Sequence, residues 1–241
     1  MKFTILDDPR YNHLAKPRTV LFQIFSFIFD LYANSMLLFY ARVKIIGKEN
    51  IPKDTPFIFV SNHNSHMDIA VLAFSTKMGY EKFGFLAAKD YWFDNTFNRI
   101  FFKNFINLIP ISRNTSGKDS IDIEDTFLLT KAFMSLNNNI IMFPEGSRGE
   151  AGQLQRFRKG AMRFSMGLNV PVLPAAIIGT DKVWPKGEWF MKPGKITIKI
   201  LPPIYPKDST QMSEQEINKE ISSKTSELQQ IVEQGLAELT S

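Results

Sequence analysis

The sequence contains no cysteine among its 241 residues. It therefore has no disulfide bond, no thiolate nucleophile and no zinc site built on cysteine. Histidine is scarce as well, since only His13, His63 and His66 are present. Any chemistry that depends on an imidazole must use one of these three side chains.

Motifs of several common enzyme classes are also missing. The stretch Ser116-Gly117-Lys118 lacks the leading glycine of a Walker A sequence, and no dinucleotide glycine fingerprint is present. There is no Gly-x-Ser-x-Gly nucleophile elbow either. The sequence gives no support to nucleotide hydrolysis or hydride transfer.

Charge is unevenly distributed along the chain. Lysine and arginine number 29 against 24 acidic residues, a net charge of +5. From Lys207 onward, seven acidic residues face three lysines, so the preceding part carries +9. A body this basic favours an anionic partner, such as phospholipid head groups or a phosphorylated substrate. We do not expect nucleic acid, because the positive charge is not interleaved with aromatic residues in any recognised module.

The most apolar stretch runs from Val20 to Ala41. Its polar residues recur every three or four positions and so share one stripe of a helix: Gln23, Ser26, Asp30 and Asn34. At about 1.5 Å per residue this helix would be about 33 Å long, enough to cross a bilayer. A mid-bilayer carboxylate is costly, so we expect the helix to lie in or dip into one leaflet. A helix packed on the domain and a true span are the alternatives, and residues 1–44 are predicted to be a membrane-associating segment.

The remainder, residues 45–241, alternates short apolar runs with helical stretches. This pattern predicts an α/β fold: a single domain with a mostly parallel or mixed central sheet flanked by helices, ending in an amphipathic helix. The strands are expected at Val43–Ile46, Pro56–Val60, Phe83–Ala87, Asn107–Ile111, Asn139–Phe143, Val172–Ile178 and Lys195–Ile200. The helices are expected at His66–Ser75, Phe93–Asn104, Ile123–Leu136, Gly160–Gly167 and Glu214–Leu239.

A polar turn follows the apolar run that ends at Val60. It contains His63 and Asp68, which approach each other only if a strand, a turn and a helix meet there. A carboxylate on one imidazole nitrogen fixes the tautomer and leaves the other nitrogen as a general base. A plain helix cap is the structural alternative, and a metal site on His63, His66 and Asp68 is another, although no fourth ligand is apparent.

Two further apolar runs end on basic residues. The run that ends at Phe143 is followed by a turn with Glu145, Gly146, Ser147 and Arg148. The guanidinium group of the arginine is planar and can donate two parallel hydrogen bonds to a phosphate. Lys159 adds positive charge just before a predicted helix, and Arg113 ends another strand as a second possible phosphate contact. Each of these turns, taken alone, could be an ordinary solvated loop. It is harder to explain all three turns in that way.

These segments, in this order, resemble the glycerolipid acyltransferase family, typified by the bacterial 1-acyl-glycerol-3-phosphate acyltransferases. The family's first block, Asn-His followed by four residues and Asp, is matched by Asn62, His63 and Asp68. Its Phe-Pro-Glu-Gly-Ser/Thr-Arg block is matched by Phe143 to Arg148 and continues through Phe157, Lys159 and Gly160. A later Val-Pro-x-x-Pro block is matched by Val170 to Pro174.

One block departs from the family pattern. Lys89 and Arg113 match it, but Asn107 stands where glycine is common and Ser112 where an acid is common. In the family this block helps to shape the site of the acceptor. The departure therefore bears on the identity of the acceptor more than on the reaction.

The resemblance implies a one-step acyl transfer from acyl-CoA or acyl carrier protein to 1-acyl-sn-glycerol 3-phosphate, giving phosphatidate. His63, oriented by Asp68, would be the base; Arg113 and Arg148 would hold the phosphate, with Asn62, Glu145, Gly146, Ser147 and Lys159 completing the substrate site. No metal and no cofactor are expected. The expected location is the cytoplasmic face of the plasma membrane, with membrane lipid as a partner and the oligomeric state undefined.

Other functions use the same residues. Glycerol 3-phosphate, another lysophospholipid or an amino-acid lysolipid are alternative acceptors. A lipid hydrolase would use the same base to activate water. A non-catalytic membrane-binding protein would not need His63 at all.

Overall fold

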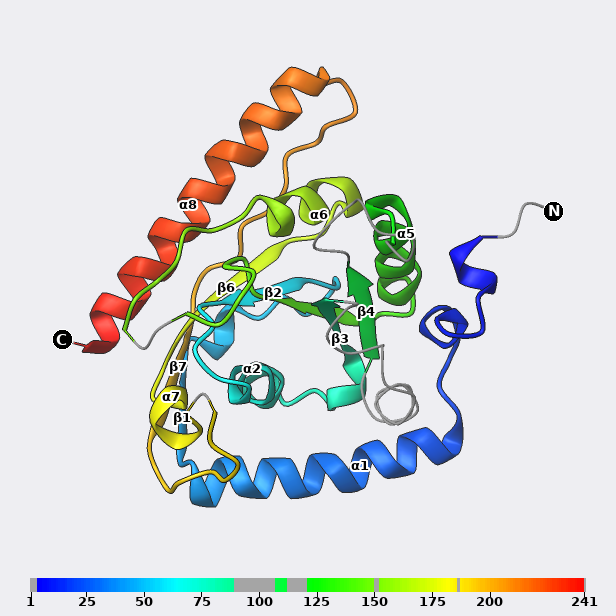
Figure 1. Ribbon diagram of the computed structural model, residues 1–241. Helices are drawn as coiled ribbons and strands as arrows, with labels where there is room; N and C mark the ends of the chain where they lie inside the picture. Colours follow the sequence, from blue (N-terminus) through cyan, green and yellow to red (C-terminus); the bar gives the residue numbers. More distant parts are fainter. Residues whose placement is uncertain (1–3, 89–106, 112–120, 150–151, 186, 241) are drawn as a thin grey trace. The chain divides into compact units, whose positions relative to one another are not determined.

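The structure, a computed structural model, describes residues 4–88, 107–111, 121–149, 152–185 and 187–240 (Figure 1). The chain forms two compact units. The first unit comprises Met1–Leu31 and Gly79–Ile141, and the second unit comprises Tyr32–Met78 and Met142–Ser241. Each unit is built from strands and helices.

The second unit contains four hydrogen-bonded strands in the order β1 (Val43–Ile46), β7 (Ile196–Ile200), β6 (Val172–Ile178) and β2 (Ile58–Ser61). β1 is parallel to β7 and β2 is parallel to β6, whereas β6 and β7 are antiparallel. All four residues of β2 are buried, as are the first six of β6. Such continuous apolar runs are typical of strands that are covered on both faces.

Helices α6 (Gly160–Leu168) and α8 (Glu214–Thr240) pack against each other and against β6 in the second unit. Figure 1 shows them on one side of these strands, with α2 (Met67–Thr76) on the other. α8 begins with a capping box, in which the Ser213 hydroxyl and backbone N–H both donate to Glu216. Its buried stripe includes Ile221, Leu228 and Val232. The short helix α7 (Thr180–Val183) follows β6 and was not predicted.

In the first unit, β3 (Phe83–Ala88) pairs in parallel with both β4 (Asn107–Ile111) and β5 (Asn139–Met142). Helix α5 (Ile123–Met134) packs against β4. Helix α5 also contacts the short 3₁₀ turns η1 (Ile5–Asp7) and η2 (Asn12–Ala15). Parallel strands joined through helices on the sheet face are the expected arrangement for an α/β chain.

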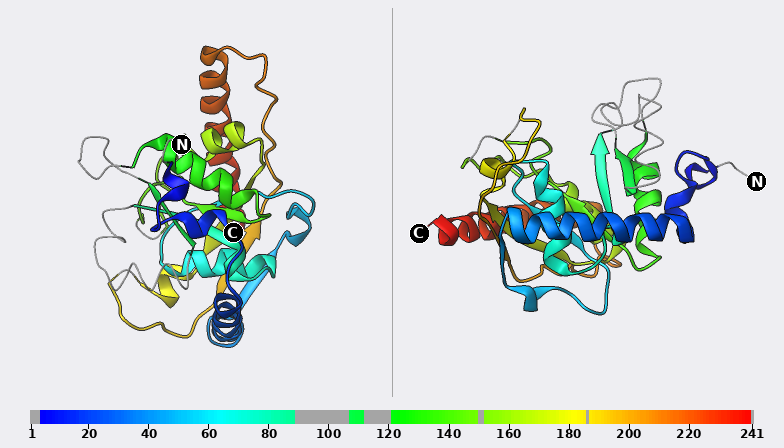
Figure 2. Two further views of the ribbon diagram at one scale, coloured as in Figure 1. Left: turned by 90° about the vertical axis from the view of Figure 1, so that its right-hand side faces the viewer. Right: turned by 90° about the horizontal axis from the view of Figure 1, so that it is seen from below.

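The long apolar helix α1 (Val20–Ser35) continues as one π-helical turn, η3 (Met36–Tyr40) (Figure 2). Together these 21 residues are long and apolar enough to cross a membrane, yet only 17% of their most apolar window is buried. A core helix of a soluble protein would be mostly buried. The large apolar side chains that lie exposed include Val20, Leu21, Ile24, Phe25, Phe27, Ile28, Phe29, Leu31, Leu38 and Phe39.

Two residues of the polar stripe of α1, Ser26 and Asp30, face the first unit, whereas Gln23 is exposed. Ser26 is buried, and the Asp30 Oδ1 atom accepts a hydrogen bond from the Tyr80 backbone N–H at 3.1 Å. The Phe29 ring packs edge-on against the Tyr80 ring, with the centroids 5.5 Å apart. The usual arrangement of an amphipathic helix is therefore reversed, because the apolar side points outward.

The predicted α/β class, with a mixed sheet and flanking helices, is confirmed. Three strands have the predicted bounds, and the other four differ by one or two residues at an end. The predicted helix Phe93–Asn104 lies outside the described residues. The predicted boundary between residues 44 and 45 stays a prediction.

Candidate active site

His63 and Asp68 meet at the carboxyl end of β2, within the second unit. The chain leaves β2 at Ser61, turns, and enters α2 at Met67, so Asp68 lies in the first helical turn. The His63 Nδ1 atom is 2.9 Å from the Asp68 Oδ2 atom. The predicted strand–turn–helix corner therefore brings the two side chains into hydrogen-bond contact.

Asp68 acts both as a helix cap and as the partner of the imidazole. Its Oδ2 atom also accepts the backbone N–H groups of Asn64, at 2.8 Å, and Ser65, at 2.9 Å. These two donors and the N-terminus of α2 fix the orientation of the carboxyl group. Because a carboxylate accepts only, Nδ1 of His63 carries the proton and Nε2 is the basic nitrogen.

The His63 ring is fixed from two further directions. The Phe143 ring stacks on it, with the centroids 3.8 Å apart and the planes 11° from parallel. The His63 backbone N–H donates to Glu145 Oε1 at 2.7 Å, and its carbonyl accepts from the Gly149 N–H at 2.9 Å. The turn after β5 thus holds the residue in place, while the side chain retains 14% exposure to solvent.

Glu145 is buried and joins three stretches of chain. Its Oε1 atom accepts from His63, and its Oε2 atom accepts from the Gln155 N–H at 3.1 Å. Burial raises the pKa of this carboxyl group, an effect that the hydrogen bonds from the His63 and Gln155 backbones oppose. With both oxygens occupied, Glu145 positions the turn that carries His63.

The glycine of this turn is required by the backbone. Gly146 has φ +80°, in the left-handed region, and a Cβ atom there would lie 2.8 Å from Nε of Arg158. The Arg158 N–H donates to the Pro144 carbonyl at 2.8 Å. This hydrogen bond therefore joins the turn to the segment before α6.

Several cationic side chains lie on this side of the second unit. Arg148 is partly exposed, and Arg158 and Lys159 are exposed. Arg148 is close enough to His66 to contribute to lowering the pKa of that imidazole, after desolvation, which is the larger cause. Ser147 is exposed, and its hydroxyl makes a long contact of 3.5 Å with Gln155 Oε1. An anionic group would find a positive potential here.

Asn62 is buried, and both ends of its amide are engaged. Its Nδ2 atom donates to the Ile177 carbonyl at 2.8 Å, and its Oδ1 atom accepts the Ile177 N–H at 2.9 Å. This pair of bonds continues the β2–β6 contact past the end of β2. We interpret Asn62 as a residue that positions His63.

The remaining predicted residues divide into two groups. His66 is the exposed N-cap of α2, and no cluster of three His, Asp or Glu side chains among the described residues has the arrangement of a metal site. Arg113, together with Lys89 and Ser112, lies outside the described residues. Asn107 is buried in the first unit, where its amide donates to the Glu81 and Phe83 carbonyls.

Four residues that support the site were given no part in the chemistry by the sequence analysis: Phe143, Gln155, Ser65 and Trp184. Phe143 is the first residue of the matched Phe-Pro-Glu-Gly-Ser-Arg block, but its stacking on His63 was not predicted. The Ser65 hydroxyl donates to the Trp184 carbonyl at 2.8 Å and accepts from the Met67 N–H. The contact with Trp184 spans 119 residues of sequence and leaves no local pattern.

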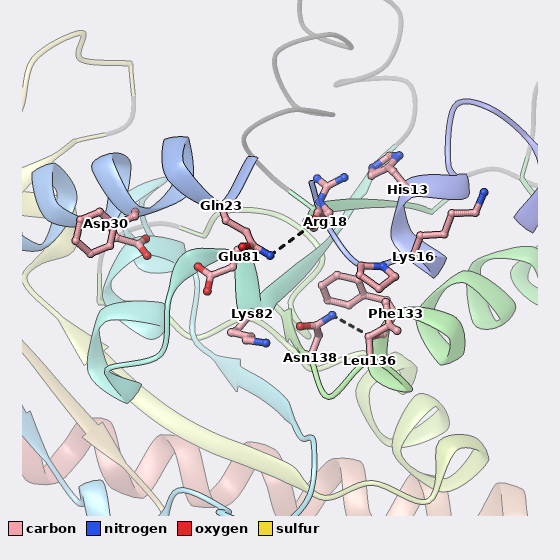
Figure 3. A pocket seen from close by; sticks show the side chains of 12 residues that line it. His13, Lys16, Arg18, Gln23, Asp30, Glu81, Lys82, Phe133, Leu136 and Asn138 are labelled. Carbon is pink, nitrogen blue, oxygen red and sulfur yellow. Dashed lines mark hydrogen bonds between the residues drawn. The ribbon is translucent and has the colours of Figure 1, made fainter. Parts of the chain in front are cut away.

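A separate cavity of about 420 Å³ lies in the first unit (Figure 3). Its lining combines Lys16, Arg18 and Lys82 with Asp30 and Glu81. The Arg18 guanidinium lies 3.9 Å from the centre of the Phe22 ring. Side chains of both signs face this cavity, and they do not define one class of ligand.

An α/β fold with a His–Asp pair beside a basic turn is suited to removing a proton from a hydroxyl group, as a transferase to a hydroxyl acceptor requires. Comparison with known proteins agrees. The model of the family described as "Acyltransferase" matches residues 42–178. The chain therefore belongs to the acyltransferase family.

Similar proteins share one named activity. A chloroplastic 1-acyl-sn-glycerol-3-phosphate acyltransferase of Brassica napus is 29% identical over 74% of this chain and 50% of its own length. A Chlamydomonas reinhardtii enzyme of the same name is 30% identical over 73% and 52%. The chain thus spans about half the length of these relatives. The crystal structure of a Thermotoga maritima 1-acyl-sn-glycerophosphate acyltransferase matches with a TM-score of 0.59 and 26% identity, over 91% of this chain and 87% of that one.

Proposed function

We propose that this protein transfers a fatty acyl group from a thioester to the free hydroxyl of 1-acyl-sn-glycerol 3-phosphate, giving phosphatidate. The observation that carries the proposal is the 2.9 Å contact between His63 Nδ1 and Asp68 Oδ2, which leaves Nε2 as the base. The names of the similar proteins support the choice of lysophosphatidate as acceptor. As the donor, acyl-CoA or acyl carrier protein would serve as co-substrate, and the reaction needs no cofactor.

In the proposed reaction, one imidazole first accepts a proton and later returns it. Nε2 of His63 removes the proton of the acceptor hydroxyl as its oxygen attacks the thioester carbonyl. The Asp68 carboxylate stabilises the imidazolium that forms. When the tetrahedral intermediate collapses, the C–S bond breaks and the thiolate takes the proton back from Nε2. An ester and a free thiol result, with no covalent enzyme intermediate.

The acceptor's phosphate would be held by the cations beside the turn. Arg148 is the first candidate, because its guanidinium offers two parallel donors to phosphate oxygens. Arg158 and Lys159 precede or cap α6, whose N-terminus also favours an anion. Arg113 stays a predicted second contact.

We further propose that α1 lies in one leaflet at the cytoplasmic face of the membrane. Support comes from the polar stripe, which contacts the protein through Ser26 and Asp30 while the apolar side chains are exposed. A helix in this orientation inserts its apolar side among acyl chains and does not need to move a carboxylate across the bilayer. Acyl chains of the lysolipid then reach the enzyme without crossing water.

An acyl-transfer assay in mixed micelles tests the proposal. Labelled lysophosphatidate is supplied with acyl-CoA or acyl carrier protein, and wild type is compared with His63→Ala. We expect wild type to form phosphatidate and the variant to lose about 10²–10⁴-fold in kcat. The folded state of the variant is checked by its thermal unfolding.

Other outcomes distinguish the alternatives. Lack of product with either donor rejects lysophosphatidate, and acceptors with other head groups are then compared. Free fatty acid released without acceptor indicates a hydrolase. Full activity of His63→Ala rejects the mechanism for any substrate.

A further inference from the structure

Two adjacent aromatic side chains of the second unit are almost fully exposed to solvent. Trp189 is 89% exposed and Phe190 is 83% exposed, the highest values among the large apolar side chains that the structure describes. Single exposed apolar residues are common, but adjacent aromatic residues at a loop tip form an apolar patch. Such a pair needs an apolar partner to be stabilised.

The loop that presents them is closed and held in shape. At its base the Lys192 N–H donates to the Val183 carbonyl at 2.7 Å. The Trp184 indole N–H donates to the Glu188 carbonyl at 2.9 Å, and Lys192 forms an ion pair with Glu188 at 3.5 Å. The tip is thereby pre-ordered, so that its aromatic side chains need not be organised at the moment of binding.

The same loop is attached to the end of the apolar helix, also within the second unit. The Tyr40 hydroxyl donates to the Met191 carbonyl at 3.1 Å, and the Gly194 N–H donates to the Tyr40 carbonyl at 3.2 Å. Leu38 and Phe39, in the last turn of that helix, are 52% and 77% exposed. The apolar surface of the helix therefore continues onto the loop.

Charge around the loop favours a lipid surface over a protein partner. Lys182, Lys192 and Lys195 are exposed on or beside it and outnumber the acidic Glu188 and Asp181. An aromatic tip with lysines behind it is the arrangement that interfacial segments use, because the rings enter the head-group region while the ammonium groups meet lipid phosphates. The aromatic tip therefore suits the head-group region of an anionic bilayer, and the lysines suit its phosphate groups.

We propose that residues 187–194 form a second membrane contact, with Trp189 and Phe190 inserted into an anionic lipid leaflet. The contact also reaches the catalytic turn, because the Trp184 carbonyl at the base of the loop accepts from Ser65. Insertion would orient the turn that carries His63 toward the membrane surface. This contact does not depend on which acyl acceptor the enzyme uses.

A fluorescent probe on the loop tests the proposal directly, and the absence of native cysteine makes labelling specific. Glu188→Cys is labelled with the environment-sensitive dye NBD, which keeps both aromatic residues. Asp208→Cys is the matched control, since it replaces an exposed carboxylate in the segment between β7 and α8. Each protein is mixed with vesicles of phosphatidylcholine and phosphatidylglycerol, and binding is confirmed by flotation.

We expect the emission at 188 to rise several-fold and shift to the blue, and to be quenched by lipids that carry a spin label near the head group. The control at 208 should not change. Adding Trp189→Ala and Phe190→Ala should abolish the change at 188 and weaken vesicle binding by about tenfold or more. Thermal unfolding verifies that this variant is folded.

The proposal is overturned if the probe at 188 stays unchanged on vesicle-bound protein. It is equally overturned if the probe responds to protein concentration without vesicles, which would assign the tip to a second copy of the chain. These readouts need no turnover, so they are separate from the test of the acyl-transfer reaction.

Discussion

His63 owes its orientation to four contacts, three of them from residues that are distant in sequence. Asp68 fixes the ring tautomer, Phe143 fixes the ring plane, and Glu145 and Gly149 hold the backbone on either side. The fold therefore holds the base in a fixed orientation before the substrate binds, so no further entropy is lost in aligning it. The two sequence blocks form one structural unit.

Asp68→Asn tests the electrostatic part of this arrangement. Asparagine retains the shape and one acceptor oxygen but cannot stabilise the imidazolium as a carboxylate does. We expect kcat to fall by about 10²–10⁴-fold, with little change in KM for the acceptor. Steady-state kinetics in the micelle assay measures both constants. A loss that appears only in KM would instead place Asp68 in substrate binding.

Gly146→Ala tests the turn, and Gly152→Ala is its matched control. Both glycines have φ near +80°, but a Cβ at 146 would meet Arg158, whereas nothing lies within 4 Å of one at 152. The left-handed backbone costs each variant about 1–2 kcal/mol. We therefore expect similar losses of stability from the backbone, with an additional loss of activity only at 146.

Thermal unfolding and kcat/KM are measured for both variants. Equal activity in the two would show that the contact between Arg158 and the turn has no part in the reaction.

At the scale of elements, the sequence predicted what depends on local pattern. The runs ending at Val60 and Met142 are apolar throughout, so their burial as strands could be predicted from composition alone. The turns after them carry the His–Asp pair and Arg148, which a parallel sheet places at one edge. The contacts of Gln155 with Glu145 and of Trp184 with Ser65 depend on the paths of loops. Loops leave no periodic pattern in the sequence from which such contacts could be predicted.

Helix α1 illustrates the same limit. Its polar stripe was evident from spacing, but the choice between a span, a packed helix and a helix in one leaflet depends on which side contacts the protein. The bond from the Tyr80 N–H to Asp30 supplies that information. It is a contact between residues 50 positions apart in sequence.

Asp30→Asn should stabilise the protein at high pH. Burial, opposed by the Tyr80 N–H and aided by the charge of Glu81, raises the pKa of Asp30 from 3.8 to about 6. A raised pKa means that the folded state binds the proton more tightly, so the stability of wild type falls as the pH rises from about 4 to 6. Asparagine keeps an acceptor for Tyr80 and has no charge to bury.

We expect Asp30→Asn to gain about 1 kcal/mol at pH 8, a figure discounted because Asp30 is partly exposed. The gain should be absent at pH 4. Urea unfolding in detergent at both pH values measures it. Asp208→Asn is the control, because the Thr210 N–H lowers the pKa of this exposed carboxyl group and its removal should bring no gain. An equal gain in both variants would disprove the argument.

The whole molecule combines a basic body with an acidic last segment. Residues before Lys207 carry a net charge of +9, and the segment from Lys207 onward carries −4. Anionic lipids attract the first and repel the second, and they also concentrate near the enzyme the phosphate-bearing acceptor that we propose. Electrostatics should therefore govern how much protein reaches the membrane, while the apolar side chains of α1 govern how firmly it stays.

Salt dependence separates these two contributions. Binding to vesicles with 30% phosphatidylglycerol should weaken by at least tenfold between 50 and 500 mM salt, because the Debye length falls from about 14 to about 4 Å. Lys192→Gln with Lys195→Gln should cost about fivefold per residue at low salt. The pair Lys219→Gln and Lys224→Gln in α8 changes the net charge equally and should have little effect. Equal losses in the two pairs would mean that net charge alone, and not the position of the lysines beside the aromatic loop, determines binding to the membrane.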